Sequence, residues 1–192
     1  MDPAEHLTYL RADIDRMLAV PDDAYGNAVA NCPGWVVKDL LEHVSGVYAF
    51  ACQNLAAEPG SELRPDVSLP EGVEGRQLLE RYAAVLLARR GQVDPSEHRP
   101  NWAWLPTAEF YFRRMAQESA VHRWDAQGAA GEAEPIPAEQ AVDGVDELFE
   151  VFLGPWAKAR GITGEGESVH LHATDADDIV GGVWTVTFVP EG

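Results

Sequence analysis

The chain has 192 residues, of which 46% are hydrophobic, so it can bury the core of a globular domain and is not disordered. Its 32 acidic residues outnumber its 14 basic residues, and the formal net charge of −18 disfavours binding to nucleic acid or to an anionic membrane. The N-terminus does not resemble a signal peptide and no apolar run could span a membrane, so we expect a cytoplasmic protein.

The N-terminal two thirds of the chain show the apolar periodicity of amphipathic helices. A first helix is expected over residues 3–20, with Asp2 as its N-cap and Pro3 in its first turn. The turn NCPGW leads into a second helix. A loop over residues 58–75, rich in proline, glycine and acidic residues, and a loop over residues 92–106, with three prolines, separate the later helices. These are predicted over residues 36–57, 76–90 and 107–127.

A linker over residues 132–137 precedes a fifth predicted helix over residues 138–160. Two strand-like segments, SVHLHATD and VWTVTFVP, then flank the turn region DADDIVGG. An isolated hairpin is marginally stable, so it must pack on the bundle, pair with another chain or begin a further domain. We therefore expect a mainly α fold: an up-down four-helix bundle in residues 1–131, and a linker, extra helix and β-hairpin appendage in residues 132–192.

Within the fourth predicted helix, Glu118 and His122 are four residues apart and share one helix face. The same face continues towards the N-terminus through the apolar residues Ala108, Tyr111 and Met115, so it is expected to face the core. A carboxylate on such a face is costly unless a positive charge compensates it. A divalent metal ion would compensate it, and both residue types are suitable ligands.

A third ligand is expected from His43, near the edge of the apolar face of the second predicted helix. Two imidazoles and one carboxylate would leave a divalent ion with an open coordination position, which is typical of catalytic sites. Such a position suits water or a thiolate. The alternative stays open that Glu118 and His122 only form a hydrogen bond on a solvated face, with His43 as a core or rim histidine.

Asp125 and Cys32 are two further candidates near this site. Asp125 follows His122 by three residues and is placed either to accept the second imidazole N–H or to lie in solvent. Cys32, in the NCPGW turn, could approach the cleft, although nothing in the sequence indicates an activated thiol, whereas Cys52 lies half a helical turn away from His43 and should not share the site.

The aromatic and remaining histidine residues favour structural roles. We expect Trp35 and Trp124 to anchor the core, since aromatic side chains bury large areas. His170 and His172 share one face of a strand, but a metal site there would lack a third ligand.

Two segments, CPGWVVKDLLEHVSG (32–46) and ESAVHRWDAQGAAG (118–131), resemble the mycothiol-dependent maleylpyruvate isomerase family. The later VHLHATD and WTVTFVPEG resemble the start of the C-terminal domain often attached to it. The resemblance implies a DinB-like four-helix bundle over residues 1–131 that holds a divalent metal, usually zinc. By motif, its ligands fall on His43, Glu118 and His122.

The resemblance further implies mycothiol as a thiol cosubstrate and a small electrophilic substrate, in an isomerase or transferase reaction. The family's full-length members have a longer C-terminal domain, so this chain is expected to be either naturally short or a fragment. A non-catalytic module of the same fold, binding metal or acting as a helical regulatory or interaction domain, is the alternative. Whether the chain forms a homodimer stays open.

Overall fold

The computed structural model describes residues 1–103, 105–131, 133–176 and 181–190. By its internal contacts the chain divides into two compact units, Asp2–Pro135 and Ile136–Gly192, the second including Met1. The expected mainly α fold with a short antiparallel hairpin is confirmed.

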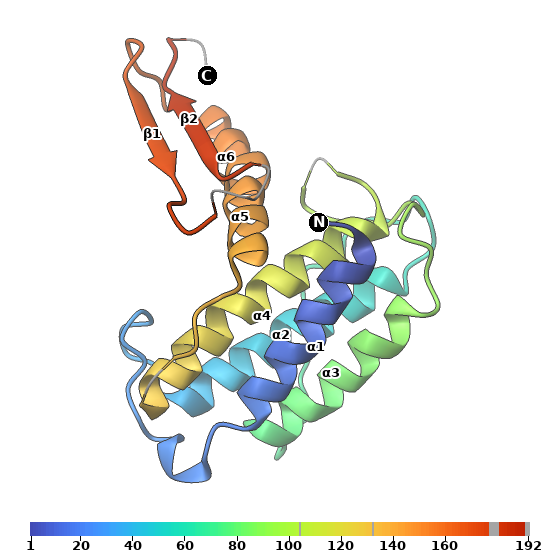
Figure 1. Cartoon of the computed structure of the whole chain (residues 1–192). Coiled ribbons are helices and arrows are strands. Elements are labelled where there is room, and N and C mark those ends of the chain that lie inside the picture. The colour runs from blue at the N-terminus through green and yellow to red at the C-terminus, as the bar shows by residue number, and fades with distance from the viewer. Residues whose placement is uncertain (104, 132, 177–180, 191–192) are drawn as a thin grey trace. The chain divides into compact units, whose positions relative to one another are not determined.

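Four long helices lie side by side in the first unit (Figure 1). Helices α1 and α4 form one pair, and α2 contacts both α3 and α4. All four begin and end close to the predicted bounds. They are α1 (Pro3–Leu18), α2 (Val37–Leu55), α3 (Arg76–Arg90) and α4 (Ala108–Ala130).

The start of α1 is fixed by the predicted N-cap. Asp2 accepts hydrogen bonds at Oδ1 from the backbone N–H groups of Ala4 (2.7 Å) and Glu5 (2.9 Å). Glu5 Oε2 in turn accepts from the Asp2 backbone N–H at 2.6 Å, which completes a capping box. Donors that the first helical turn cannot satisfy internally are therefore satisfied by side chains.

Helix α3 starts at the end of the bundle where α1 ends and α2 begins. Arg76 donates to the carbonyl of Val20 at 2.6 Å, just beyond α1, and the Gly75 N–H donates to Glu42 Oε1 in α2 at 3.3 Å. Helices α2 and α3 therefore run parallel. In the up-down bundle expected from the sequence, neighbouring helices would run antiparallel. The long connection of residues 56–75 returns the chain along the bundle to make this possible.

The apolar faces predicted for α2 and α4 form the core between these helices. Helix α2 contributes Leu40, Leu41, Val44 and Tyr48, all completely buried. Helix α4 extends past Gly128, where the sequence predicted its end, to Ala130, and Gly131 follows with a φ of 149°. The predicted fourth helix is thus correct in position but too short at its C-terminal end.

The second unit contains the predicted fifth helix in three parts. Helix α5 (Ala138–Glu147) continues through a π-helical turn (Leu148–Leu153) into α6 (Gly154–Ala159). Strands β1 (Ser168–His172) and β2 (Val183–Thr187) pair antiparallel, with His170 opposite Thr185. Of the predicted turn DADDIVGG, residues 177–180 lie outside the described part of the chain.

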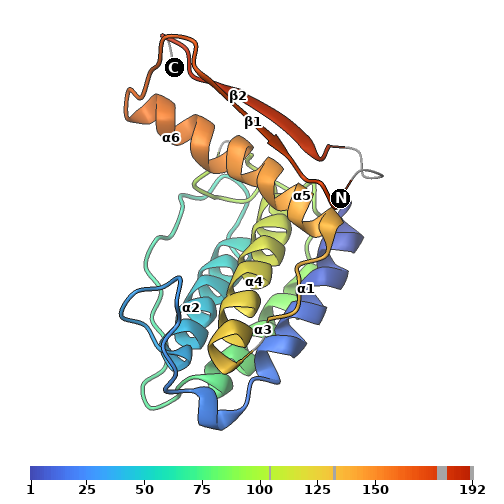
Figure 2. The same cartoon turned by 60° about the vertical axis from the view of Figure 1, so that its left-hand side comes forward.

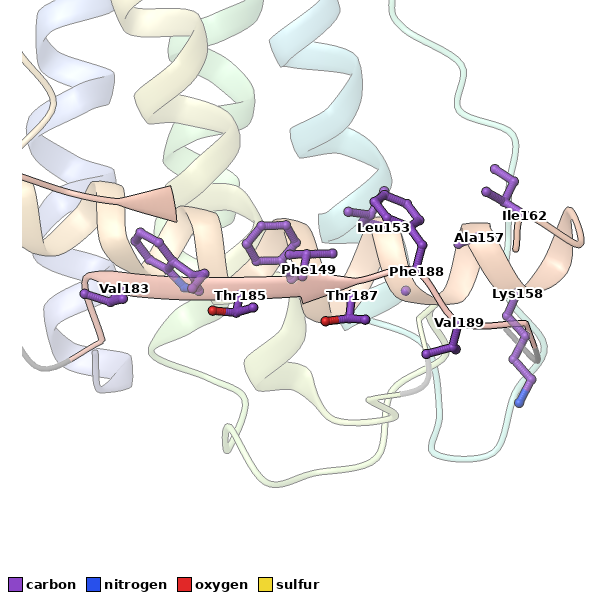
Figure 3. A pocket seen from close by; sticks show the side chains of 13 residues that line it. Phe149, Leu153, Ala157, Lys158, Ile162, Val183, Thr185, Thr187, Phe188 and Val189 are labelled. Atoms are coloured by element: carbon purple, nitrogen blue, oxygen red, sulfur yellow. The ribbon is translucent and has the colours of Figure 1, made fainter. Parts of the chain in front are cut away.

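The hairpin packs on the helix of its own unit, whereas the alternatives drawn from the sequence were the bundle, another chain or a further domain. Trp184 of β2 donates from Nε1 to Asp146 Oδ1 of α5 at 2.7 Å. Figures 2 and 3 show the hairpin lying along this helix, and an apolar groove of about 560 Å³ lies between β2 and the helix. Its lining includes Phe149, Leu153 and Phe188.

Candidate metal centre

Helices α2 and α4 bring His43, Glu118 and His122 together. The apolar residues that precede Glu118 on its face of α4, Ala108, Tyr111 and Met115, are buried as predicted. One nitrogen from each imidazole and one oxygen of the carboxylate lie within 4.8 Å of one another. We call these three residues the triad.

The carboxylate of Glu118 lies at the centre of the triad. Its Oε1 is 3.1 Å from His43 Nε2 and 3.3 Å from His122 Nε2. The centroids of the two imidazole rings are 5.1 Å apart, in an edge-to-face arrangement. The triad thus directs the Nε2 atoms of both histidines towards the same carboxylate oxygen.

Glu118 is ionised despite being largely buried. Burial alone would raise its pKa, but hydrogen bonds from His122 and His43 and the charge of Arg114 hold the pKa of this carboxyl well below its usual range. Arg114, one helical turn earlier, donates from Nη2 to Glu118 Oε2 at 3.3 Å. The surroundings of Glu118 therefore favour its ionised form at the centre of the triad.

His122 has partners on both of its ring nitrogens. Its Nδ1 is 3.2 Å from Asp125 Oδ2, and Asn31 donates to Asp125 Oδ1 at 2.8 Å. Burial opposes the imidazolium, but the hydrogen bonds and charges of Glu118 and Asp125 outweigh it and raise the pKa of His122. Asp125 thus has the buried, imidazole-facing position that was one of its two sequence-based alternatives.

The two tryptophans of the matching segments do not anchor the core. Trp35 is half-buried, and its ring centroid lies 5.0 Å from that of His43, so it packs beside the triad. Trp124 is 42% exposed, and its neighbour Arg123 takes the buried position on α4 instead. The prediction of core anchoring was wrong for Trp124, because α4 directs the paired charge of Arg123 inwards instead, and Trp35 is only half-buried beside His43.

The two cysteines lie in different surroundings, and only Cys32 is near the candidate ligands, as expected. The Cys32 thiol lies within 4.8 Å of a ring nitrogen of His122 and a carboxylate oxygen of Asp125. Burial and the charge of Asp125 raise the pKa of Cys32. Cys52 is buried in α2 and belongs to neither cluster of candidate ligands in the described part of the chain.

Arg114 and Asn31 were not singled out from the sequence. Arg114 precedes Glu118 by four residues, a spacing that favours an ion pair on a helix, so a signal for it was present. The contact of Asn31 joins positions 94 residues apart and had no local signal. His170 and His172 lie on exposed strand β1, where His170 Nδ1 is 3.1 Å from the hydroxyl oxygen of Thr185.

The donor set of the triad fits a divalent metal ion. Two imidazole nitrogens and one carboxylate oxygen are ligands that Zn²⁺ accepts, and three protein ligands leave one tetrahedral position for another group. The carboxylate is ionised, and Asp125 accepts at the Nδ1 side of His122, which orients Nε2 towards the site. The side chain of His43 is 37% exposed, so small molecules can reach this end of the triad.

Comparison with known proteins identifies one family. A family model described as the mycothiol maleylpyruvate isomerase N-terminal domain matches residues 7–127, which include all three triad residues. Searches of the curated proteins and of the solved structures found no match. Among the described residues, no helix is both long enough and apolar enough to cross a membrane.

Proposed function

Because the chain belongs to the mycothiol maleylpyruvate isomerase N-terminal domain family, we propose that it is a metal-dependent enzyme that uses a low-molecular-weight thiol such as mycothiol. The proposed ligands of the metal, which we take to be Zn²⁺, are His43, Glu118 and His122. The observation that supports this most directly is the convergence of their donor atoms from two helices. The proposed reaction is an isomerisation or an S-transfer on a small electrophile.

The bound ion would supply Lewis-acid chemistry that lowers the pKa of a coordinated thiol. Glu118 contributes the only negative charge among the three ligands, which leaves a net positive charge to attract a thiolate. Asp125 holds the Nδ1 proton of His122, so that the Nε2 lone pair is directed to the site. The Trp35 ring packs against His43 at a centroid distance of 5.0 Å and so restricts the orientation of this ligand.

In the proposed reaction, the sulfur of the cosubstrate forms a bond to an electrophilic carbon of the substrate. For an isomerase, the addition converts a double bond into a single bond, rotation follows, and the thiol leaves again as the double bond re-forms. For a transferase, the other carbon of the former double bond takes up the proton that the thiol released, and the sulfur adduct is the product. Isomerisation and S-transfer both need a sulfur nucleophile at the proposed metal site, so the triad supports both reactions equally.

Metal analysis and turnover of purified protein test this function. We expect about one zinc ion per chain and conversion of maleylpyruvate, or of another electrophile, that depends on mycothiol. His122→Ala should abolish both, whereas the control variant His170→Ala, on exposed β1, should retain both. Metal without turnover would favour a non-catalytic metal-binding module, and the absence of both would favour a helical interaction module.

A further inference from the structure

A second cluster of metal-ligand residue types shares His122 with the triad. Cys32 Sγ, an Asp125 carboxylate oxygen and a His122 ring nitrogen lie within 4.8 Å of one another. Cys32 comes from the loop before α2, whereas Asp125 and His122 are three residues apart on α4. A thiol, an imidazole and a carboxylate together form a donor set that binds thiophilic cations.

The loop that carries Cys32 is held in place against α4. The Val29 N–H donates to the Trp35 carbonyl at 3.0 Å, and the Trp35 N–H donates to the Cys32 carbonyl at 3.0 Å. Asn31 then attaches this loop to Asp125 through its 2.8 Å hydrogen bond. The Cys32 thiol is therefore positioned by the backbone hydrogen bonds of its loop and by the hydrogen bond between Asn31 and Asp125, which is itself a candidate ligand.

Different ring nitrogens of His122 face Glu118 of the triad and Asp125 of this cluster. Nε2 is 3.3 Å from Glu118 Oε1, whereas Nδ1 is 3.2 Å from Asp125 Oδ2. A neutral imidazole has one lone pair for a metal ion, because its other nitrogen carries the proton. An ion on the Nδ1 side would therefore direct the Nε2 proton to Glu118, and His122 would no longer be available as a ligand of the triad.

We propose that Cys32, His122 and Asp125 form a second metal position, which takes a thiophilic divalent cation such as Cd²⁺ and excludes an ion from the triad. The cation binds the thiolate sulfur, and the thiol proton is released to solvent. Thiolate and carboxylate together neutralise the charge of the ion, and the soft sulfur selects for soft metals. Cation binding at this second position does not require catalytic turnover at the triad.

Titration of the metal-free protein with Cd²⁺ tests the position through ultraviolet absorption, since a cadmium–thiolate bond has a charge-transfer band. We expect the band in the wild type, in His43→Ala and in Cys52→Ser, the matched control for the buried thiol. Cys32→Ser should lack the band. Persistence of the band in Cys32→Ser would overturn the proposal.

Alkylation of the wild-type protein gives a second readout that needs no variant. Saturating Cd²⁺ should protect Cys32 from iodoacetamide, as quantified by mass spectrometry of its peptide. An unchanged alkylation rate would contradict the proposal. Protein first loaded with zinc should release one zinc ion for each Cd²⁺ bound; if both ions stay bound together, the two positions are not exclusive and that part of the proposal is wrong.

Discussion

The carboxylate of Glu118 determines the chemistry of the residues around it. It contacts two imidazoles and one guanidinium, and no other acid lies among the triad residues. A group in this position stabilises protonated histidine in the metal-free chain and, in the proposed metal-loaded chain, would hold a cation. Protons and metal ions should therefore compete for the same atoms.

The raised pKa of His122 predicts how this competition depends on pH. Metal binding requires the neutral imidazole, so metal affinity should fall as the pH drops through a value above the ordinary 6.5 of histidine. Asp125→Asn removes one of the charges that raise this pKa, so the fall should begin at a lower pH. Competition with a chelator across pH measures both curves, and an identical onset in the variant would contradict the assignment.

In the metal-free protein, the same residues predict a pH window for stability. His122, with a folded pKa raised above 6.5, contributes stability that is present below that pH and lost as the pH rises through its folded value. Glu118, with a folded pKa below 4.5, contributes stability that is present above that pH and lost as the pH falls through its folded value. Glu118→Gln should therefore reduce the free energy of unfolding most at pH values between the folded pKa of Glu118 and that of His122. Urea denaturation of metal-free wild type and variant at several pH values checks this, and a difference that does not depend on pH would contradict it.

At the scale of elements, α4 connects the triad to the rest of the bundle. Its buried Arg123 donates from Nε to Asp13 Oδ1 of α1 at 3.0 Å, and both side chains are almost inaccessible. Arg123 also donates to Gln127 Oε1 at 3.0 Å and to the carbonyl of Glu134. The ion pair fixes α1 against the helix that carries Glu118 and His122.

Removing one partner of this buried pair should strongly destabilise the bundle. Arg123→Met leaves the Asp13 carboxylate buried without its main compensating charge, which typically costs about 3–5 kcal/mol. Lys38→Met is the control, because its ion pair with Glu74 is exposed and such pairs contribute about 0–1 kcal/mol. Chemical denaturation of both variants measures the difference. Equal losses would show that the buried pair has no special role.

The helices and the faces of their site residues could be predicted from the sequence, but the contacts between helices could not. The 3.6-residue period places Glu118 and His122 on one face of α4 and His43 near the apolar face of α2. The 3.1 Å contact of His43 with Glu118 depends on the offset of two packed helices, which no local pattern encodes. The burial of Arg123 depends on Asp13, 110 residues away, and this partner explains why Trp124 lies outside.

At the scale of the whole molecule, the chain combines a helical bundle with a second unit that has its own packing. The hairpin alone would be marginally stable, and its hydrogen bond from Trp184 to Asp146 joins it to α5. The strands were predictable from their alternating pattern, but the helix they pack on was not, because amphipathic strands carry no information about their partner.

Trp184→Phe tests this attachment. The variant keeps an aromatic ring but loses the donor, so the hairpin should be less stable by about 0.5–1.5 kcal/mol. Amide hydrogen exchange should become faster in β1 and β2, with the amides of α1–α4 as an internal reference. Unchanged exchange in both strands would show that the hydrogen bond does not hold the hairpin.

The central claim is that the triad is a metal site, and diffraction from zinc-loaded crystals at the zinc absorption edge tests it most directly. We expect one anomalous peak at about 2.0–2.2 Å from His43 Nε2, His122 Nε2 and a Glu118 carboxylate oxygen. A peak at His170 and His172 instead, or no peak near the triad in fully loaded protein, would contradict the claim.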